Sequence, residues 1–271
     1  MLASIVWDVD PTIFEIGGRE IRWYGLMWGI GFLLAYKYAE WIFKKENRPE
    51  EWTDRLFVYS MVGVIVGARL GHCLFYQWDY YTSNPVEILK IWEGGLASHG
   101  GTLGAILAAW LFSRKITKQS VWWLFDRIIP SVALLCFCIR FGNLMNSEIF
   151  GFPTTLPWGF MFVRSYEWQV LYAGQACHPT QTYEMIYCLV TFVVCGLMYW
   201  KYSAGKRVGL LLGIFWIGIF GTRFILEFIK NNQEAFEDSF ALNMGQILSL
   251  PFVVWGIYLI INSFVKQQKV S

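Results

Sequence analysis

Arginine side chains in long apolar segments are the first candidates for chemistry, because a buried charge in such a segment is costly. Arg140 and Arg223 carry planar guanidinium groups, which suit bidentate binding of a phosphate. Arg69 could join them, or it could pair with a carboxylate or helix carbonyls and only stabilise the fold. Arg223 and Glu227 lie four residues apart, so they could also form a structural ion pair. The arginines predict an anion-binding site.

Other polar side chains in the same segments could complete such a site. His99 is the histidine best placed to act as a base, and Asn143 and Asn146 follow Arg140 closely. The three histidines and the dispersed carboxylates form no pattern of metal ligands, so neither a metal nor a cofactor is predicted. The six cysteines lie mostly inside apolar runs, and we interpret them as small buried side chains.

Composition shows what kind of protein must position these residues. The chain has 271 residues, of which 56% are apolar and 15% charged. Soluble domains average about 45–50% apolar and about 25% charged residues. The net charge of +2 argues against nucleic-acid binding. These values predict a protein that crosses a membrane several times.

Hydropathy predicts an all-α fold with seven transmembrane helices, because seven segments reach the length of about 20 residues that a span requires. We treat the chain as a single membrane domain, residues 1–271, in which residues 142–180 form a small extracytoplasmic head. The predicted spans are approximately 23–43, 56–77, 95–113, 120–141, 181–200, 208–229 and 243–263.

The distribution of lysine and arginine predicts the orientation. Twelve of these residues lie in the connections on one side, five on the other, and five within or beside the spans. The richer side faces the cytoplasm, so the N-terminus is outside and the C-terminus inside. The first 22 residues contain four acidic residues and no long apolar stretch, so no cleavable signal peptide is expected.

This topology brings the polar side chains of all seven helices to the outer half of the membrane. Scattered placement would have divided them between both leaflets. Glycines on the second and third spans (Gly67, Gly71, Gly101 and Gly104) predict close helix packing. The pair Asp126 and Arg127 lies near the inner surface, and we interpret it as structural. The polar layer is Tyr24, Arg69, His99, Arg140, Asn143, Asn146, Glu148, His178, Gln181, Glu184, Arg223, Glu227, Asn243 and Gln246.

The run from Arg140 to Gly151, RFGNLMNSEIFG, resembles the R-x-G-N-F-x-N-x-E-x-x-G signature of the prolipoprotein diacylglyceryl transferase family. Similar blocks occur in the same order elsewhere: GARLG from Gly67, GGLASHGG from Gly94 and HPTQTYE from His178. Two residues depart from the family pattern. Leu144 stands where Phe is usual, and Lys230 stands where a second arginine is common.

The resemblance implies a multi-pass enzyme of the bacterial inner (cytoplasmic) membrane with its active site facing the outer leaflet. It would transfer the diacylglyceryl group of phosphatidylglycerol to the lipobox cysteine in the signal peptide of a prolipoprotein. Glycerol 1-phosphate would be released. Besides membrane lipids, its partners would be these two substrates and no nucleic acid.

The resemblance also implies roles for individual residues. Arg140 and Arg223 would hold the phosphate, and Glu148 and Glu227 would orient these arginines. His99 would be the general base for the thiol, although a hydrogen bond to the lipid head group would place it equally well. The remaining substrate-binding set is Tyr24, Arg69, Asn143, Asn146 and Gly151.

One competing interpretation is an anion or lipid transporter that binds its cargo through the membrane arginines. Transport requires polar residues along a path to the cytoplasmic side. The inner half of the predicted bundle is mainly apolar, which favours the enzyme.

Overall fold

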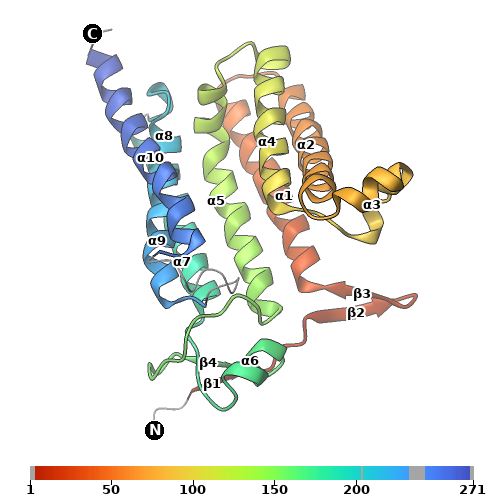
Figure 1. Cartoon of the computed structure of the whole chain (residues 1–271). Helices are drawn as coiled ribbons and strands as arrows, with labels where there is room; N and C mark the ends of the chain where they lie inside the picture. Colours follow the sequence, from red (N-terminus) through yellow and green to blue (C-terminus); the bar gives the residue numbers. More distant parts are fainter. Residues whose placement is uncertain (1–3, 203, 232–241, 269–271) are drawn as a thin grey trace. The chain divides into compact units, whose positions relative to one another are not determined.

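The computed structural model describes residues 4–202, 204–231 and 242–268, and this part of the chain is mostly helical (Figure 1). It divides into two compact units, Met1–Lys37 with Asp126–Ser271, and Tyr38–Phe125. Within the described residues, five helices are long and apolar enough to cross a membrane. The coarse prediction of a helical membrane protein is therefore confirmed. These helices are Glu51–Phe75, Val121–Met145, Thr180–Lys201, Leu210–Ile229 and Met244–Val265.

The other two predicted spans also coincide with helices, α1 (Trp23–Lys45) and α4 (Ser98–Phe112). α4 has 15 residues, fewer than the roughly 20 that a span requires, and continues into a π turn, η3 (Ser113–Thr117). The second half of α1 carries three lysines and a glutamate. The passage of α1 and α4 through a membrane, and with it the count of seven, stays a prediction.

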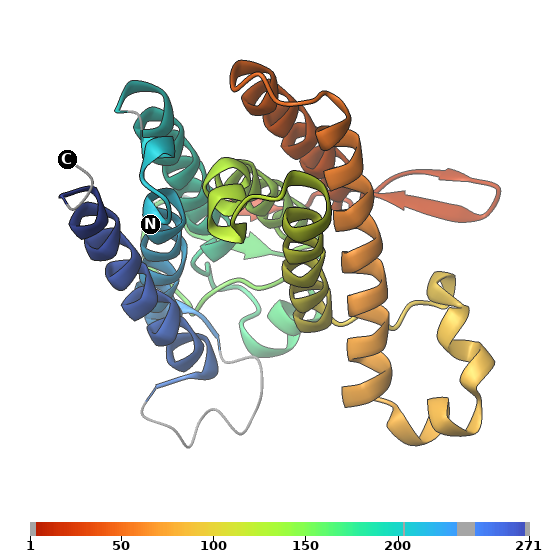
Figure 2. The ribbon, with the colours of Figure 1, turned by 90° about the horizontal axis from the view of Figure 1, so that it is seen from above.

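In the unit Tyr38–Phe125, α2 (Glu51–Phe75) packs directly against α4 (Figure 2). Glycines make this approach possible: a Cβ atom at Gly67 or Gly100 would overlap a backbone carbonyl oxygen of the other helix. A Cβ atom at Gly71 would lie 2.8 Å from Cα of Gly100. The predicted use of the glycines in helix packing is correct for Gly67, Gly71 and Gly104, but on α4 the close contacts come from Gly100 and Gly104 and not from Gly101.

The connection between α2 and α4 is built of short helical turns. They are α3 (Trp78–Ser83), η1 (Pro85–Leu89) and η2 (Ile91–Glu93). Gly94 and Gly95 follow with φ of 92° and 70°, the left-handed region that glycine adopts readily. Their positive φ turns the chain into the first residues of α4.

The other unit contains α5 (Val121–Met145) from Asp126 onward, α7 (Thr180–Lys201) and α10 (Met244–Gln268). Between α7 and α10 lies an interrupted helix that packs against both (Figures 1 and 2). A π turn divides this helix, and the Thr222 hydroxyl donates to the carbonyl of Gly218 beside it. Its parts are η4 (Ala204–Lys206), α8 (Leu210–Trp216), η5 (Ile217–Gly221), α9 (Thr222–Leu226) and η6 (Glu227–Ile229).

Asp126 and Arg127 hold the start of α8. The Asp126 carboxylate accepts hydrogen bonds from the backbone N–H groups of Gly209 (2.5 Å) and Leu212 (3.0 Å). Arg127 donates to the carbonyl of Gly205. A carboxylate at the N-terminus of a helix satisfies free N–H groups. These contacts agree with the structural interpretation of the pair.

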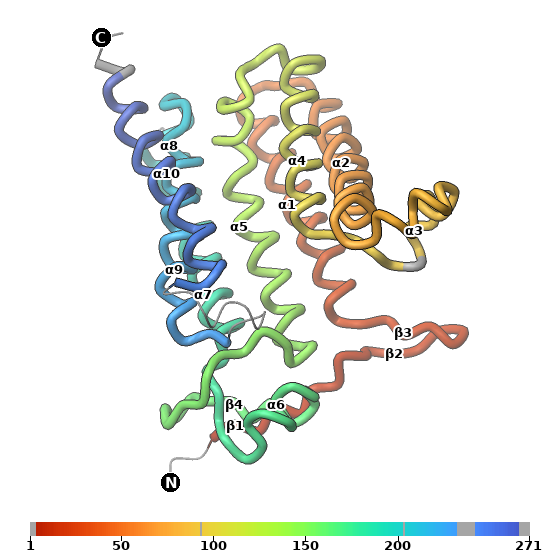
Figure 3. The backbone as a smooth tube through the Cα atoms, in the orientation of Figure 1, coloured from red at the N-terminus to blue at the C-terminus, as the bar shows by residue number. Residues whose placement is uncertain are grey.

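Short strands join the N-terminus to the segment that follows α5, a feature that the all-α prediction omitted. β1 (Ile5–Trp7) pairs in parallel with β4 (Phe160–Phe162), and α6 (Tyr166–Leu171) follows (Figure 3). Strands of three residues are too short to give a clear alternation in the sequence. A small core fills this region: Leu144, Phe150, Phe162, Trp168 and Cys177 are all buried.

A second pair of strands, β2 (Thr12–Ile16) and β3 (Arg19–Arg22), forms an exposed antiparallel hairpin before α1 (Figure 1). Gly17 and Gly18 turn the chain with positive φ. The backbone N–H of Trp23 then donates to the carbonyl of Pro11, which attaches the start of α1 to the base of the hairpin.

Candidate active site

Arg140 lies near the end of α5 and pairs with Glu184 in the second turn of α7. The distance between Arg140 Nε and Glu184 Oε2 is 2.9 Å. The Arg140 side chain is 21% exposed, whereas that of Glu184 is 1% exposed. A terminal guanidinium nitrogen of Arg140 also donates to Asn143 Oδ1 at 3.3 Å. The arginine is thus fixed along its Nε edge and at one terminal nitrogen, while its side chain as a whole stays partly exposed.

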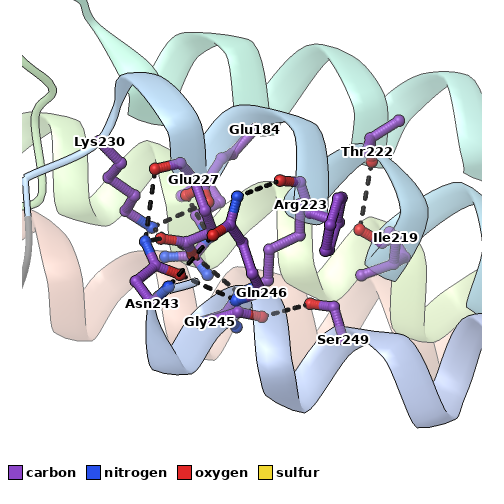
Figure 4. Close-up of polar contacts among 12 residues, drawn as sticks. Glu184, Ile219, Thr222, Arg223, Glu227, Lys230, Asn243, Gly245, Gln246 and Ser249 are labelled. Carbon is purple, nitrogen blue, oxygen red and sulfur yellow. Dashed lines mark hydrogen bonds and ion pairs between the residues drawn. The ribbon is translucent and has the colours of Figure 1, made fainter. Parts of the chain in front are cut away.

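Arg223 on α9 is held in the same way, one helical turn before Glu227. Arg223 Nε donates to Glu227 Oε1 at 3.1 Å, and the other carboxylate oxygen accepts from Asn243 Nδ2 at 3.2 Å (Figure 4). A Cβ atom at Gly245 would lie 2.5 Å from this carboxylate, so only glycine leaves room for it. The predicted pairing of Arg223 with Glu227 is present.

Lys230 connects the two ion pairs. Its ammonium lies 3.2 Å from Glu184 Oε1 and 3.6 Å from Glu227 Oε1, and its side chain is 3% exposed (Figure 4). Charges therefore alternate along the series Arg140, Glu184, Lys230, Glu227 and Arg223, which we call the charge series. Desolvated charges of one sign require partners of the other sign, and here every charge has one.

The start of α10 supports the same site through a reciprocal cap. Asn243 Oδ1 accepts from the backbone N–H of Gln246, and Gln246 Oε1 accepts from the backbone N–H of Asn243. This is the capping-box arrangement. It orients Asn243 so that its amide reaches Glu227.

The loop after α5 organises a second group of polar side chains. Glu148 Oε1 accepts from Asn143 Nδ2 at 2.6 Å and from Asn146 Nδ2 at 3.4 Å. Ser147 and Ile149 adopt positive φ, which directs the loop back toward α5. Sequence analysis predicted that Glu148 orients an arginine. In the structure Asn143 stands between them, because it accepts from Arg140 and donates to Glu148.

The motif from His178 anchors this loop. The backbone N–H of Gly151 donates to the carbonyl of His178, and Gln181 donates to the carbonyl of Glu148 at 2.5 Å. A Cβ atom at Gly151 would overlap the carbonyl oxygen of Ile229 and lie 2.8 Å from the Thr180 side chain. Gly151 therefore allows two protein segments to approach, which is a structural reason for glycine here.

Burial in this region favours neutral side chains. It lowers the pKa of His178, whose Nδ1 lies 3.2 Å from the Tyr183 hydroxyl. It also raises the pKa of the buried Cys177 thiol to about 11, so this cysteine is protonated at neutral pH.

Comparison with known proteins identifies the family to which this constellation belongs. The profile of prolipoprotein diacylglyceryl transferase matches residues 11–262. A phosphatidylglycerol–prolipoprotein diacylglyceryl transferase of Porphyromonas gingivalis is 50% identical, covering 96% of this chain and 95% of the relative. Proteins of the same name from Chloroherpeton thalassium and Bacteroides fragilis are 43% and 42% identical, with at least 95% of each chain covered. The chain belongs to the prolipoprotein diacylglyceryl transferase family.

The family signature, Arg140 to Gly151, thus includes the start of the charge series and the loop that supports it. Tyr24 at the start of α1 contacts the same segment, because a Cβ atom at Gly142 would lie 2.9 Å from its ring. Tyr24, Arg140, Asn143, Asn146, Glu148, Arg223 and Glu227 all belong to one compact unit.

Arg69 belongs to the other unit of this family member, and its guanidinium is bound to backbone. It donates to the carbonyls of Glu87 (2.5 Å), Gly94 (2.7 Å) and Ile88 (2.9 Å), and the Tyr81 ring lies 4.9 Å away. These contacts favour the structural alternative for Arg69. It shapes a cavity of about 540 Å³ beside His72 within this unit.

His99 is also in that unit, exposed in the first turn of α4. Its proposed action at the same substrate as the arginines therefore stays a prediction. In contrast, two residues central to the charge series were not among the predicted site residues. Glu184 was recognised as a member of the polar layer and of the HPTQTYE block, without a role in the site, and Lys230 as a departure from the family pattern.

Proposed function

We propose that this protein transfers the diacylglyceryl group of phosphatidylglycerol to the lipobox cysteine of prolipoproteins. In this reaction a C–S bond forms at a glycerol carbon and the C–O bond to the phosphate breaks. The thiol proton is lost, and the phosphate leaves as glycerol 1-phosphate. The observation that carries the proposal is the charge series, which presents two arginines in a member of a family with this named activity.

Arg140 and Arg223 bind the phosphate in this proposal. Both are tied to buried carboxylates through Nε, and both are partly exposed, at 21% and 32%. This geometry directs terminal guanidinium nitrogens away from the anchoring carboxylate. Fixed donors aimed at a leaving group stabilise its developing negative charge without reorganising in the transition state.

The polar head group is bound by Tyr24 on α1 and by Asn143 and Asn146, which belong to the segment that ends at Gly151. Among the described residues, no hydrogen-bond donor reaches the buried Oδ1 atom of Asn146. The terminal glycerol of phosphatidylglycerol carries hydroxyl donors that would satisfy this acceptor. Glu148 orients Asn143 and Asn146 rather than contacting the phosphate.

His99 accepts the thiol proton as general base. A neutral imidazole nitrogen can take this proton, and the exposed position of His99 on α4 leaves it accessible. The alternative role, a hydrogen bond to the head group, predicts a different dependence on pH and is tested separately. Arg69 is assigned to support of its loop and not to substrate.

The proposed topology has seven spans in the bacterial inner membrane. The N-terminus and the head, residues 142–180, are periplasmic, and the C-terminus is cytoplasmic. The excess of lysine and arginine in the opposite connections supports this orientation. The lipid enters sideways from the outer leaflet, where the signal-peptide cysteine also arrives.

The direct test uses purified protein, phosphatidylglycerol vesicles and a peptide with a lipobox cysteine. The expected product is a peptide heavier by one diacylglyceryl group, with equimolar glycerol 1-phosphate. A matched peptide with serine in place of cysteine should remain unmodified, because the hydroxyl is far less acidic than a thiol. Absence of the lipidated cysteine peptide would refute the proposal.

A further inference from the structure

Lys230 occupies the centre of the charge series and binds both carboxylates that hold the arginines. Glu184 belongs to α7 and Glu227 to η6, so the two acids come from segments far apart in the chain. The Lys230 ammonium nitrogen lies 3.2 Å from Oε1 of Glu184 and 3.6 Å from Oε1 of Glu227. The three side chains are 3%, 1% and 7% exposed, so water contributes little to their solvation.

The backbone at Lys230 is fixed as well. Lys230 forms an antiparallel bridge with Gly151, and the backbone N–H of Phe152 donates to the carbonyl of Ile229. These contacts tie Lys230 to the end of the family signature. The fixed backbone restricts the position of the ammonium, and the ammonium in turn restricts the positions of both carboxylates.

The outer members of the series are the arginines. Because Arg140 contacts Glu184 and Arg223 contacts Glu227 through Nε, the position of each carboxylate sets the direction of its guanidinium. An ammonium carries a positive charge and three donors, so it can serve two carboxylates that approach from different elements.

We propose that Lys230 is a positioning residue, which holds Glu184 and Glu227 together and thereby sets the spacing of Arg140 and Arg223. Glu184 is the second positioning residue, since its two carboxylate oxygens join Lys230 to Arg140. This inference rests on the proposed binding of phosphate by the two arginines. Neither Lys230 nor Glu184 contacts substrate in this scheme.

The test compares Lys230→Met, Lys230→Arg, Glu184→Gln and the double variant Lys230→Met/Glu184→Gln, with rates expressed per folded enzyme. Lys230→Met should lower kcat/KM by about 100-fold, because small displacements of catalytic groups cost this much. Most of the loss should be in kcat, because the bound substrate in its ground state still contacts both arginines. Lys230→Arg keeps the charge and should recover most of the loss.

The double variant keeps the net charge of the series and separates positioning from simple loss of folding. If Lys230 acts on Arg140 through Glu184, the double variant should be no worse than the poorer single variant. The matched control is Lys206→Met, which removes an exposed lysine and should leave the rates unchanged.

Three results would overturn the inference: unchanged kcat/KM in Lys230→Met, no rescue in Lys230→Arg, or single effects that multiply in the double variant. An inactive wild-type protein in the same assay would instead refute the proposed function. The two failures are therefore distinguishable.

Discussion

The guanidinium of Arg140 on α5 lies against the carboxylate of Glu184 on α7, with 2.9 Å between Nε and Oε2. The pairing uses the side of the guanidinium, so the terminal nitrogens point elsewhere. Arg223 and Glu227 repeat the arrangement at 3.1 Å, although these two residues lie on one helical segment. Each arginine is bound to a buried carboxylate through its own Nε atom. This shared arrangement indicates that the remaining donors of the two guanidinium groups have the same role.

The first prediction concerns the planar guanidinium groups of these arginines. Arg140→Lys and Arg223→Lys should each lower kcat by at least about tenfold, since removal of one preorganised donor costs about 10²- to 10³-fold and lysine retains the charge. A single ammonium cannot bind both the carboxylate and the phosphate in the same geometry. Lipidated peptide measured by mass spectrometry gives the rates.

Arg164→Lys provides the matched control. Arg164 pairs with Asp8 and Asp10 on the surface, where ion pairs contribute little. Its activity should equal that of the wild type. Wild-type activity in both Arg140→Lys and Arg223→Lys would exclude the phosphate-binding role.

The second prediction concerns orientation. In a background without native cysteines, Glu167→Cys in the segment after α5 should react with an impermeant thiol reagent in intact cells. Lys206→Cys in η4 should react only after the membrane is permeabilised. Both positions are exposed, so differences in reactivity report the side of the membrane. The opposite labelling pattern would invert the topology and move the charge series to the inner leaflet.

Sequence patterns predict the long helices well because their apolar runs are continuous. The segments 120–141 and 181–200 differ from α5 and α7 by at most four residues at each end. The strands β1 and β4 were missed, because their pairing joins residues about 155 positions apart and leaves no local pattern. Long-range pairing of this kind is decided by the tertiary fold. The hairpin of β2 and β3 is local, and its Gly17–Gly18 turn is a signal that could have been used.

In the candidate site, too, local contacts could be predicted from the sequence and long-range contacts could not. Arg223 and Glu227 could be paired from their spacing of four residues. The partner of Arg140 could not, because Glu184 is on another helix and the loop between them does not fix its rotation. The burial of Lys230 could not be predicted from the sequence either: its side chain turns inward, since two buried carboxylates lie within 4 Å. The N-x-x-Q spacing of Asn243 and Gln246 is a capping signal that could have been used.

The third prediction tests His99 as the general base. His99→Gln retains hydrogen bonding and cannot accept the proton. If His99 is the base, the variant should be nearly inactive at pH 7 and should recover in part near pH 9, because a free thiol ionises with a pKa of about 8.5. The measurement is kcat against pH with phosphatidylglycerol saturating. A variant whose defect lies in KM for the lipid, with no alkaline recovery, would show that His99 only binds the head group.

The last prediction follows from the lowered pKa of His178, which burial causes. An imidazole in the unfolded chain has a pKa of about 6.5, so below this pH the unfolded state binds a proton more readily than the folded state. Stability should therefore fall as the pH decreases from about 7 toward the folded-state pKa. The motif from His178 supports the loop that carries Asn146 and Glu148, so this loss should affect the site.

His178→Gln removes the titrating group and keeps a polar side chain beside Tyr183. Thermal unfolding of both proteins in the same detergent should be measured between pH 5 and pH 7.5. Carboxylates titrate in both, so the difference in Tm isolates His178. The wild type should lose more stability than the variant as the pH falls, because only the wild type must exclude a proton from a partly buried imidazole. Parallel pH curves would mean that His178 is protonated as readily in the folded protein as in the unfolded chain.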